Sequence, residues 1–106
     1  MNTSINNFDA IEKLIFEEGL RIKAIDFHPE LDMMLVLLNT KAVLHQKIST
    51  YPSLQKASRK DLENYEFIGG GTGIHWTSLD EDLSLKGFLR DELKTIIGYN
   101  KNAIAV

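Results

Sequence analysis

The spacing of apolar residues in the first part of the chain predicts an amphipathic helix from Phe8 to Glu18. Its apolar positions recur every three or four residues, at Phe8, Ile11, Leu14 and Ile15. Asn6 or Asn7 can cap this helix, because a short polar side chain before the first turn accepts a hydrogen bond from the free backbone N–H groups there. Gly19 follows as the expected stop.

After the helix the apolar positions alternate, which is the period of a β-strand. The first strand runs from about residue 20 to 27. The alternation slips by one position after Ala24, which indicates a bulge or the entry of the strand into a turn. His28-Pro29-Glu30 then forms a turn. Met33–Leu38 is apolar on both faces and suits a central strand, and Lys41–Ile48 supports a third. These strands predict an antiparallel meander.

The next segment predicts short helices and a further strand. Pro52 suits the first turn of a helical segment, since it has no N–H to leave unpaired. Ser58-Arg59-Lys60-Asp61 has the spacing of a capping box and opens a second short helix through Leu62. Tyr65–Ile68 is apolar enough for a short fourth strand.

A last amphipathic helix follows Ser84, its expected cap. Its apolar residues at helical spacing are Leu85, Phe88, Leu89, Leu93, Ile96 and Ile97. Gly98 is the expected stop, and residues 99–106 have no strong pattern. The predicted fold class is therefore α+β: a small antiparallel sheet of three to four strands with short helices, and amphipathic helices at the N- and C-terminal ends. We expect residues 1–106 to form a single domain.

Composition narrows the protein class. The chain has no cysteine, so disulfides and thiol chemistry are excluded and a reducing, cytoplasmic setting is expected. The N-terminus has no signal-peptide pattern, and the longest apolar run, Met33–Leu38, is far shorter than the ~20 residues that span a bilayer. We therefore expect a soluble protein with no membrane association.

Charge is unevenly distributed although the net charge is only −3. Residues 41–60 contain basic side chains and no acidic ones, and an ordinary solvated surface is the simplest explanation. The alternative is a surface that faces a partner, with the candidate residues Tyr51, Lys56, Arg59 and Lys60. An acidic chain is atypical of a dedicated nucleic-acid binder, so direct nucleic-acid binding is not expected.

Residues 69–83 combine glycines, the only Trp and several carboxylates, which makes them the candidate functional or structural cluster. The candidate residues are Gly73, His75, Trp76, Asp80 and Asp82. The glycines lack the Gly-Lys-Ser/Thr ending of a phosphate-binding loop, so we expect them to supply left-handed backbone positions in a tight loop.

Two interpretations of this segment remain open. His75, Asp80 and Asp82 could offer ligands to a metal ion, but Asp80, Asp82 or Ser84 could instead cap the last helix. Trp76 could be a core residue or an exposed anchor for a partner, and its size favours the core. No catalytic residue, metal ligand or cofactor is assigned.

Several motifs resemble one family. They are Tyr51-Pro52-Ser53-Leu54, the run from Asp61 to Gly69, Gly73-Ile74-His75-Trp76 and Leu79-Asp80-Glu81-Asp82-Leu83-Ser84. They are similar to the bacterial domain of unknown function 2442 over about residues 20–89, which leaves residues 1–19 as a helical extension and 90–106 as a C-terminal helix and tail. The resemblance implies a small α+β domain with an antiparallel sheet and implies no catalytic residue. Family members often look like halves of toxin–antitoxin-type pairs.

Three positions depart from the family pattern. Ser53 stands where Arg is common, Thr77 stands where Pro usually follows the Trp, and Tyr51 replaces a Phe. If that Arg binds a partner in other members, this chain binds differently. A helix-turn-helix domain that follows in some relatives has no counterpart in this sequence.

These observations predict a non-enzymatic protein-binding or regulatory module, the antitoxin-like partner of a small protein encoded beside it, with a homo-oligomer as a second kind of assembly. The alternative is a small metal-assisted hydrolase or nuclease that uses His75, Asp80 and Asp82. A weaker alternative is nucleic-acid contact through the basic residues of 41–60.

Overall fold

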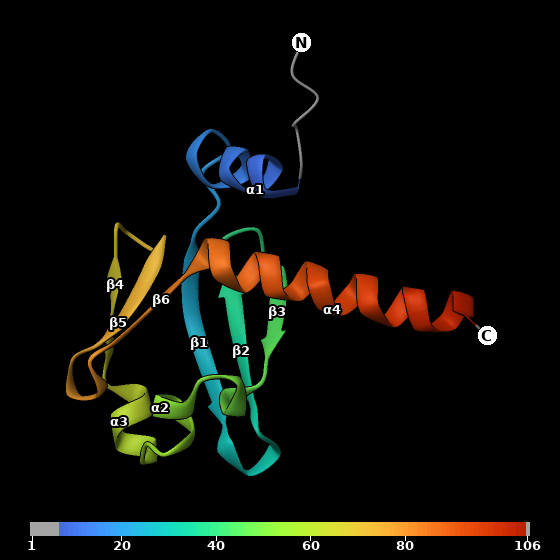
Figure 1. The fold of residues 1–106 in the computed structure, drawn as a ribbon. Coiled ribbons are helices and arrows are strands. Elements are labelled where there is room, and N and C mark those ends of the chain that lie inside the picture. Colours follow the sequence, from blue (N-terminus) through green and yellow to red (C-terminus); the bar gives the residue numbers. More distant parts are fainter. Residues whose placement is uncertain (1–6, 106) are drawn as a thin grey trace.

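A computed structural model of the protein describes residues 7–105 and places the side chains of residues 10–98. Figure 1 shows two small β-sheets side by side, with a long C-terminal helix crossing one of them and short helices at the two ends of the sheets. The fold is α+β, as the sequence pattern predicted.

The first sheet, sheet A, is the predicted meander. It consists of β1 (Ile22–His28), β2 (Met33–Leu38) and β3 (Val43–Gln46), antiparallel and in that order. The pairing of β1 with β2 shifts register between Ile22 and Ala24, as at a bulge, which lies just before the position where the sequence pattern slips. β2 is the central strand, as its apolar sequence indicated.

The second sheet, sheet B, was only partly predicted. It consists of β4 (Tyr65–Ile68), β5 (Gly73–Trp76) and β6 (Glu81–Ser84), also antiparallel and in order. The expected fourth strand is therefore present, but it belongs to a separate sheet, and residues 73–76 and 81–83 of the loop-like segment are strands. The strand pattern is weak there because β5 begins with glycine and β6 has two adjacent carboxylates and a single leucine.

Left-handed residues close the two hairpins of sheet B. Gly69, Gly70 and Gly71 have φ angles of 58°, 69° and 118° and turn β4 into β5. Asp80, at φ 50°, ends the turn between β5 and β6. Glycine adopts these conformations without a Cβ clash, so the prediction that the run supplies positive-φ positions is confirmed.

Among residues 7–105, four α-helices accompany the sheets: α1 (Asn7–Phe16), α2 (Pro52–Gln55), α3 (Arg59–Glu63) and α4 (Leu85–Ala105). Short 3-10 turns lie at Pro29–Leu31, Ile48–Thr50 and Thr77–Leu79. Pro52 is in the first turn of α2 as expected. The predicted cap at Asn6 lies outside the described residues.

The two predicted serine caps are confirmed. The Ser58 hydroxyl accepts a hydrogen bond from the Asp61 N–H at 3.1 Å, and the Ser84 hydroxyl accepts one from the Gly87 N–H at 2.9 Å. Each bond satisfies one backbone donor that a helix leaves unpaired at its N-terminus.

The two glycines predicted to end helices behave differently. Gly19, at φ 78°, allows the Leu20 N–H to bond back to the Leu14 carbonyl at 3.0 Å, which ends α1. Gly98 was expected to stop the last helix, and this is wrong, because α4 continues to Ala105. A glycine inside a helix costs only about 1 kcal/mol relative to alanine, which the flanking turns offset.

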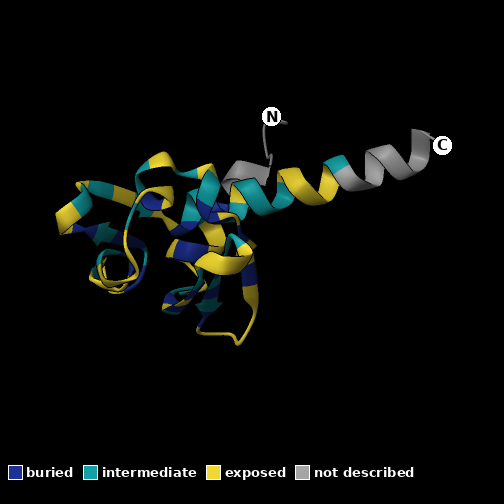
Figure 2. Cartoon of the chain, turned by 90° about the horizontal axis from the view of Figure 1, so that it is seen from below, coloured by how far each residue is buried: buried dark blue, intermediate teal, exposed yellow. Residues whose placement is uncertain are grey.

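One hydrophobic core extends through both sheets and the first half of α4. Its largest fully buried side chains include Trp76, Phe88, Ile15, Ile22 and Met34. Figure 2 shows the buried residues gathered in the body of the molecule, whereas α4 carries exposed residues at 94–97. Within the described residues, no helix is long and apolar enough to cross a membrane.

Two hydrogen bonds join the sheets along β1. The Ile22 N–H donates to the Gly71 carbonyl at 2.8 Å, and the Ile25 N–H donates to the Tyr65 hydroxyl at 3.3 Å. The glycine turn and β4 therefore cover part of the free edge of β1, which would otherwise expose unpaired backbone groups.

A pair of glycine variants tests this junction. A Cβ at Gly71 would lie 2.6 Å from the Ile22 carbonyl oxygen, whereas a Cβ at Gly70 would meet nothing within 4 Å. Gly70→Ala should lower the unfolding free energy by about 1–2 kcal/mol, because alanine is strained in the left-handed conformation and no clash is added. Gly71→Ala should cost about 2–5 kcal/mol, because a steric clash is added. Chemical denaturation measures both, and equal losses would contradict this description of the junction.

Candidate functional site

Trp76 lies at the end of β5 and is fully buried. Its indole N–H donates to the Leu62 carbonyl of α3 at 2.8 Å. A buried N–H needs such a partner, so this bond lets the largest side chain of the candidate cluster enter the core. Of the two interpretations of Trp76, the structure therefore supports the core residue.

An aromatic cluster surrounds Trp76 and spans both sheets. Phe27 of β1 makes edge contacts with Trp76 and with Tyr65 of β4, with ring centroids 6.5 Å and 6.0 Å apart, and the Tyr65 and Trp76 rings lie 6.2 Å apart. Such pairs stabilise by about 0.5–1.5 kcal/mol each beyond the area they bury. The cluster and the two inter-sheet hydrogen bonds hold sheets A and B together.

His75 alternates with Trp76 along β5 and therefore points to the opposite face of sheet B. Glu66, His75 and Asp82 form one cross-strand row there, one residue from each strand. His75 Nδ1 donates a hydrogen bond to the Asp82 carboxylate. This bond, followed by the nearby negative charges, raises the pKa of His75 above its ordinary value of 6.5.

Asp80 does not join His75 and Asp82 at one ligand site. It occupies the left-handed turn that leads into β6, and no group of three or more His, Asp or Glu side chains within the described part of the chain could hold a metal ion. The capping role considered for Asp80, Asp82 or Ser84 belongs to Ser84. Gly73, another residue of the candidate cluster, is buried at the start of β5, and the Ile68 side chain lies beside it.

Tyr51, a candidate partner-facing residue, is half-buried and faces inward. Its ring packs edge-on against Phe88 with centroids 6.3 Å apart, and its hydroxyl donates to Gln46 Oε1 at 2.9 Å, with Asp91 Oδ2 at 3.4 Å. Burial, followed by the Asp91 charge, raises the pKa of Tyr51 to about 12. It is the polar edge of the core rather than an open contact residue.

The other candidates of this set, Lys56, Arg59 and Lys60, are exposed on and beside the short helices α2 and α3. Arg59 forms ion pairs with Glu63 at 3.0 Å and with Glu30 at 3.7 Å, so acidic neighbours offset part of the basic charge. The structure therefore separates Tyr51 from these three exposed side chains and does not form one surface from all four.

The departure at Ser53 has a structural partner. Ser53 in α2 donates a hydrogen bond to the Glu81 carboxylate at the start of β6. This bond connects the short helix to sheet B through a side chain smaller than the common Arg. Thr77 follows Trp76 in an exposed 3-10 turn.

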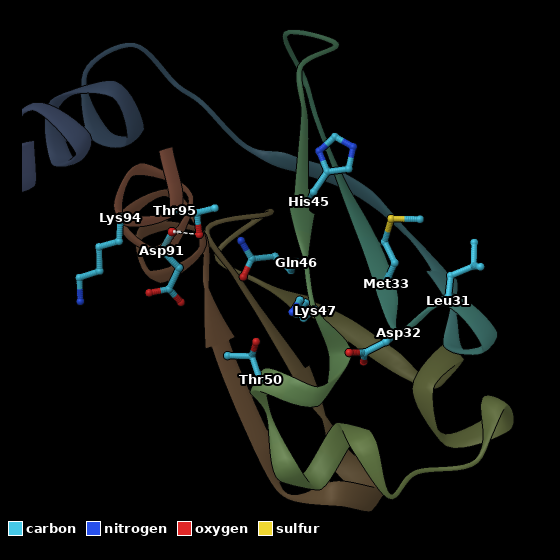
Figure 3. A pocket seen from close by; sticks show the side chains of 10 residues that line it. All are labelled: Leu31, Asp32, Met33, His45, Gln46, Lys47, Thr50, Asp91, Lys94 and Thr95. Atoms are coloured by element: carbon cyan, nitrogen blue, oxygen red, sulfur yellow. Dashed lines mark hydrogen bonds between the residues drawn. The ribbon is translucent and has the colours of Figure 1, made fainter. Parts of the chain in front are cut away.

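A groove of about 600 Å³ runs between α4 and the free edge of β3 (Figure 3). Figure 3 shows Asp91, Lys94 and Thr95 of α4 on one side and Gln46 pointing toward them from β3. The full lining is Leu31, Asp32, Met33, His45, Gln46, Lys47, Thr50, Asp91, Lys94 and Thr95. Its acidic and basic residues are mixed, so it favours no charged ligand.

One group in the groove is already engaged. The Asp32 carboxylate accepts hydrogen bonds from Ser49, from the N–H at 2.8 Å and from the hydroxyl at 2.6 Å, and these bonds lower the pKa of Asp32. No sequence motif indicates the groove, because its residues come from separate elements.

The geometry defines a class of protein: a small α+β domain in which two three-stranded antiparallel sheets meet beside a long C-terminal helix. The chain belongs to the family described as protein of unknown function (DUF2442), which matches residues 22–93. The family resemblance seen in the sequence motifs is therefore confirmed. No curated protein matches the chain significantly.

Two solved structures are similar. A crystal structure of a protein of unknown function from Rhodospirillum rubrum is 27% identical, with a TM-score of 0.59 over 69% of this chain and 88% of that one. A solution NMR structure of an uncharacterized protein from Chromobacterium violaceum is 23% identical, with a TM-score of 0.62 over 87% of each chain. The second likeness concerns the fold alone, and neither description assigns an activity.

Replacing Trp76 tests its structural role. Trp76→Ala should lower the unfolding free energy by about 3–5 kcal/mol through the cavity it leaves. Trp76→Phe should cost about 1–3 kcal/mol, because the Leu62 carbonyl then loses its donor. Thr77→Ala, an exposed neighbour, should change stability by less than about 0.5 kcal/mol. Wild-type tryptophan emission should be blue-shifted and resistant to quenchers, and emission like that of free indole would contradict the core assignment.

The His75–Asp82 pair predicts a pH dependence of stability. Because the folded pKa of His75 lies above 6.5, the stabilisation that the pair contributes is complete below the unfolded pKa. It is lost as the pH rises through the folded pKa. The difference in unfolding free energy between the wild type and His75→Gln should therefore shrink toward alkaline pH.

An NMR titration isolates the cause. In Asp82→Asn, the pKa of His75 should move down toward its ordinary value of 6.5. If the pKa of His75 is the same in the wild type and in Asp82→Asn, the hydrogen bond to Asp82 does not raise it.

Proposed function

We propose that the protein is a non-enzymatic protein-binding module that docks a small protein partner through the exposed half of α4. The observation that carries this proposal is the apolar stripe of that helix, which continues past the body of the domain. In its first turns the stripe is covered by the core, and further along it is open to solvent.

The burial of successive turns of α4 supports this reading. Leu85 and Phe88 are almost completely buried, Leu89 and Leu93 pack partly against the core, and Ile96 is 47% exposed. Leu85, Leu89 and Ile96 lie at i, i+4 and i+11, which is one face of a helix. The change in exposure therefore comes from the end of the body beneath the helix and not from a rotation of the stripe.

Ile97 adds to the open end of the stripe, being 51% exposed beside Ile96. Two adjacent β-branched side chains exposed on a projecting helix lose hydrophobic stabilisation that a partner could supply. Figures 1 and 2 show α4 extending away from the sheets, so its sides are accessible. The suitable partner carries an apolar groove that takes an amphipathic helix.

The partner in this proposal is a small protein encoded beside this one, in an antitoxin-like pair in the cytoplasm. The proposal assigns no reaction to the protein. The groove beside α4 mixes opposite charges, and two hydrogen bonds from Ser49 already engage its Asp32 carboxylate. In the part of the chain that the structure describes, no group of three or more His, Asp or Glu side chains could hold a metal ion. These features support binding rather than metal-assisted hydrolysis.

A pair of double variants on α4 tests this proposal. Ile96→Ser with Ile97→Ser should weaken partner binding by about 2 kcal/mol or more, the scale of an interface hot spot. Lys94→Ser with Thr95→Ser is the matched control on the neighbouring turn, whose side chains are exposed and polar. Both double variants should keep the wild-type melting temperature within a few degrees, because these residues contribute little to the core.

Co-expression with the neighbouring gene product, followed by size-exclusion chromatography and calorimetry, measures the binding. Co-elution lost in the isoleucine variant and kept in the control supports the proposal. Separate elution of the two wild-type proteins, or equal binding by both variants, contradicts it.

A further inference from the structure

Sheet A has a second apolar surface, on the side away from the core. β2 alternates buried with half-buried residues, and the half-buried set is Met33, Leu35 and Leu37. Cross-strand pairing aligns Leu37 with Ala24 on β1 and with Val43 on β3. We name this surface the outer face of sheet A: Ala24, Asp26 and His28 of β1, Met33, Leu35 and Leu37 of β2, and Val43 and His45 of β3.

The core does not cover the outer face. In the described structure, the half-buried side chains that pack against the core do not include Met33, Leu35 or Leu37, and Val43 is 42% exposed. An antiparallel sheet with one solvated face normally alternates apolar with polar residues. β2 instead carries apolar residues on both faces, which is the pattern of a strand covered on both sides.

One cross-strand row of the outer face carries different polar groups at its two edges. Asp26, Leu35 and His45 form one cross-strand row, with Asp26 on β1 and His45 on β3. The Asp26 side chain is 60% exposed. His45 is also exposed, and so is Lys47, two residues further along the chain. His28 donates to one Asp26 oxygen at 2.8 Å, and the carboxylate has a second oxygen for another donor. One edge therefore offers an acceptor and the other a donor.

We infer that the outer face of sheet A binds a second copy of this chain, with a two-fold axis parallel to β2. That axis turns the second sheet over so that its β3 lies above β1 of the first. Asp26 of each copy then meets His45 of the other, while the Leu35 side chains pack together at the centre. A two-fold axis perpendicular to the strands would place Asp26 over Asp26 and His45 over His45, so the charges select the first arrangement.

The size of the face limits the strength of this dimer. Six residues at about 3.3 Å and three strands at about 4.8 Å give a face of roughly 20 Å by 14 Å. Two such faces bury roughly 560 Å² in total, well below the range typical of stable complexes. We expect a dimer that dissociates on dilution. Sheet faces pack about 10 Å apart, which lets Asp26 and His45 reach each other.

A charge exchange tests the arrangement. Asp26→Lys places a cation over His45 and Lys47 of the other copy, and His45→Glu places an anion over Asp26. Each should lower the association constant by about tenfold or more, and the double variant Asp26→Lys/His45→Glu should restore it to within about threefold. Lys60→Glu on α3, exposed and away from this face, should leave association unchanged. Sedimentation velocity at protein concentrations from micromolar to millimolar measures the association constants of the wild type and of these four variants.

The possible outcomes separate the arrangements. A monomeric wild type at millimolar concentration overturns the inference. Dimerisation that neither single variant weakens, or that the double variant does not restore, shows that the copies meet through another surface, such as the free edge of β3, and also overturns it.

Cross-linking gives an independent readout. Because the chain has no cysteine, a single substitution introduces the only thiol. Leu35→Cys should form a covalent dimer with a short bismaleimide, since the two Leu35 positions face each other across the axis. Ile97→Cys, on the exposed end of α4, is the control and should react far less. Equal yields would contradict the inference.

This self-association is independent of partner docking through α4. Ile96→Ser with Ile97→Ser should leave the sedimentation behaviour of the isolated protein unchanged, and Asp26→Lys should leave binding of the neighbouring gene product unchanged. Failure of either proposal is therefore visible without the other.

Discussion

Burial of the Trp76 indole holds α3, sheet B and sheet A together. A chain of this length has one small core, and the ring can enter it only because the Leu62 carbonyl accepts the indole N–H. This bond fixes α3 against sheet B, and the ring contact with Phe27 fixes sheet B against sheet A. The glycine turn is part of the same requirement, since Gly71 must approach Ile22 more closely than a side chain allows.

The elements with a strong period could be predicted from the sequence, and those without one could not. Sheet A, its bulge and the serine caps follow from apolar alternation and from local hydrogen bonding, which depend on near neighbours. Sheet B has strands of four residues whose alternation is hidden by glycine and carboxylates, so only β4 was identified. The extent of α4 beyond Gly98 was missed because a glycine signal is local, whereas helix length is decided by the sum over many turns.

The candidate site shows the same division. Burial of Trp76 followed from its size, and the glycine turn followed from composition. The pairing of His75 with Asp82 instead depends on the register between β5 and β6, and the groove beside α4 depends on residues from separate elements. Register and convergence are tertiary properties that spacing along one chain does not contain. The two surfaces proposed for binding share one physical basis, since each continues an apolar pattern beyond the point where the core covers it.

Native-state hydrogen exchange tests most directly the claim that Trp76 joins the two sheets into one cooperative unit. The amide groups of β2 and β5 should then exchange with the same free energy of opening, equal to that of global unfolding, and Trp76→Phe should lower both together. A β5 that opens with a much lower free energy than β2, and that alone responds to Trp76→Phe, would show that sheet B unfolds independently and would contradict this account.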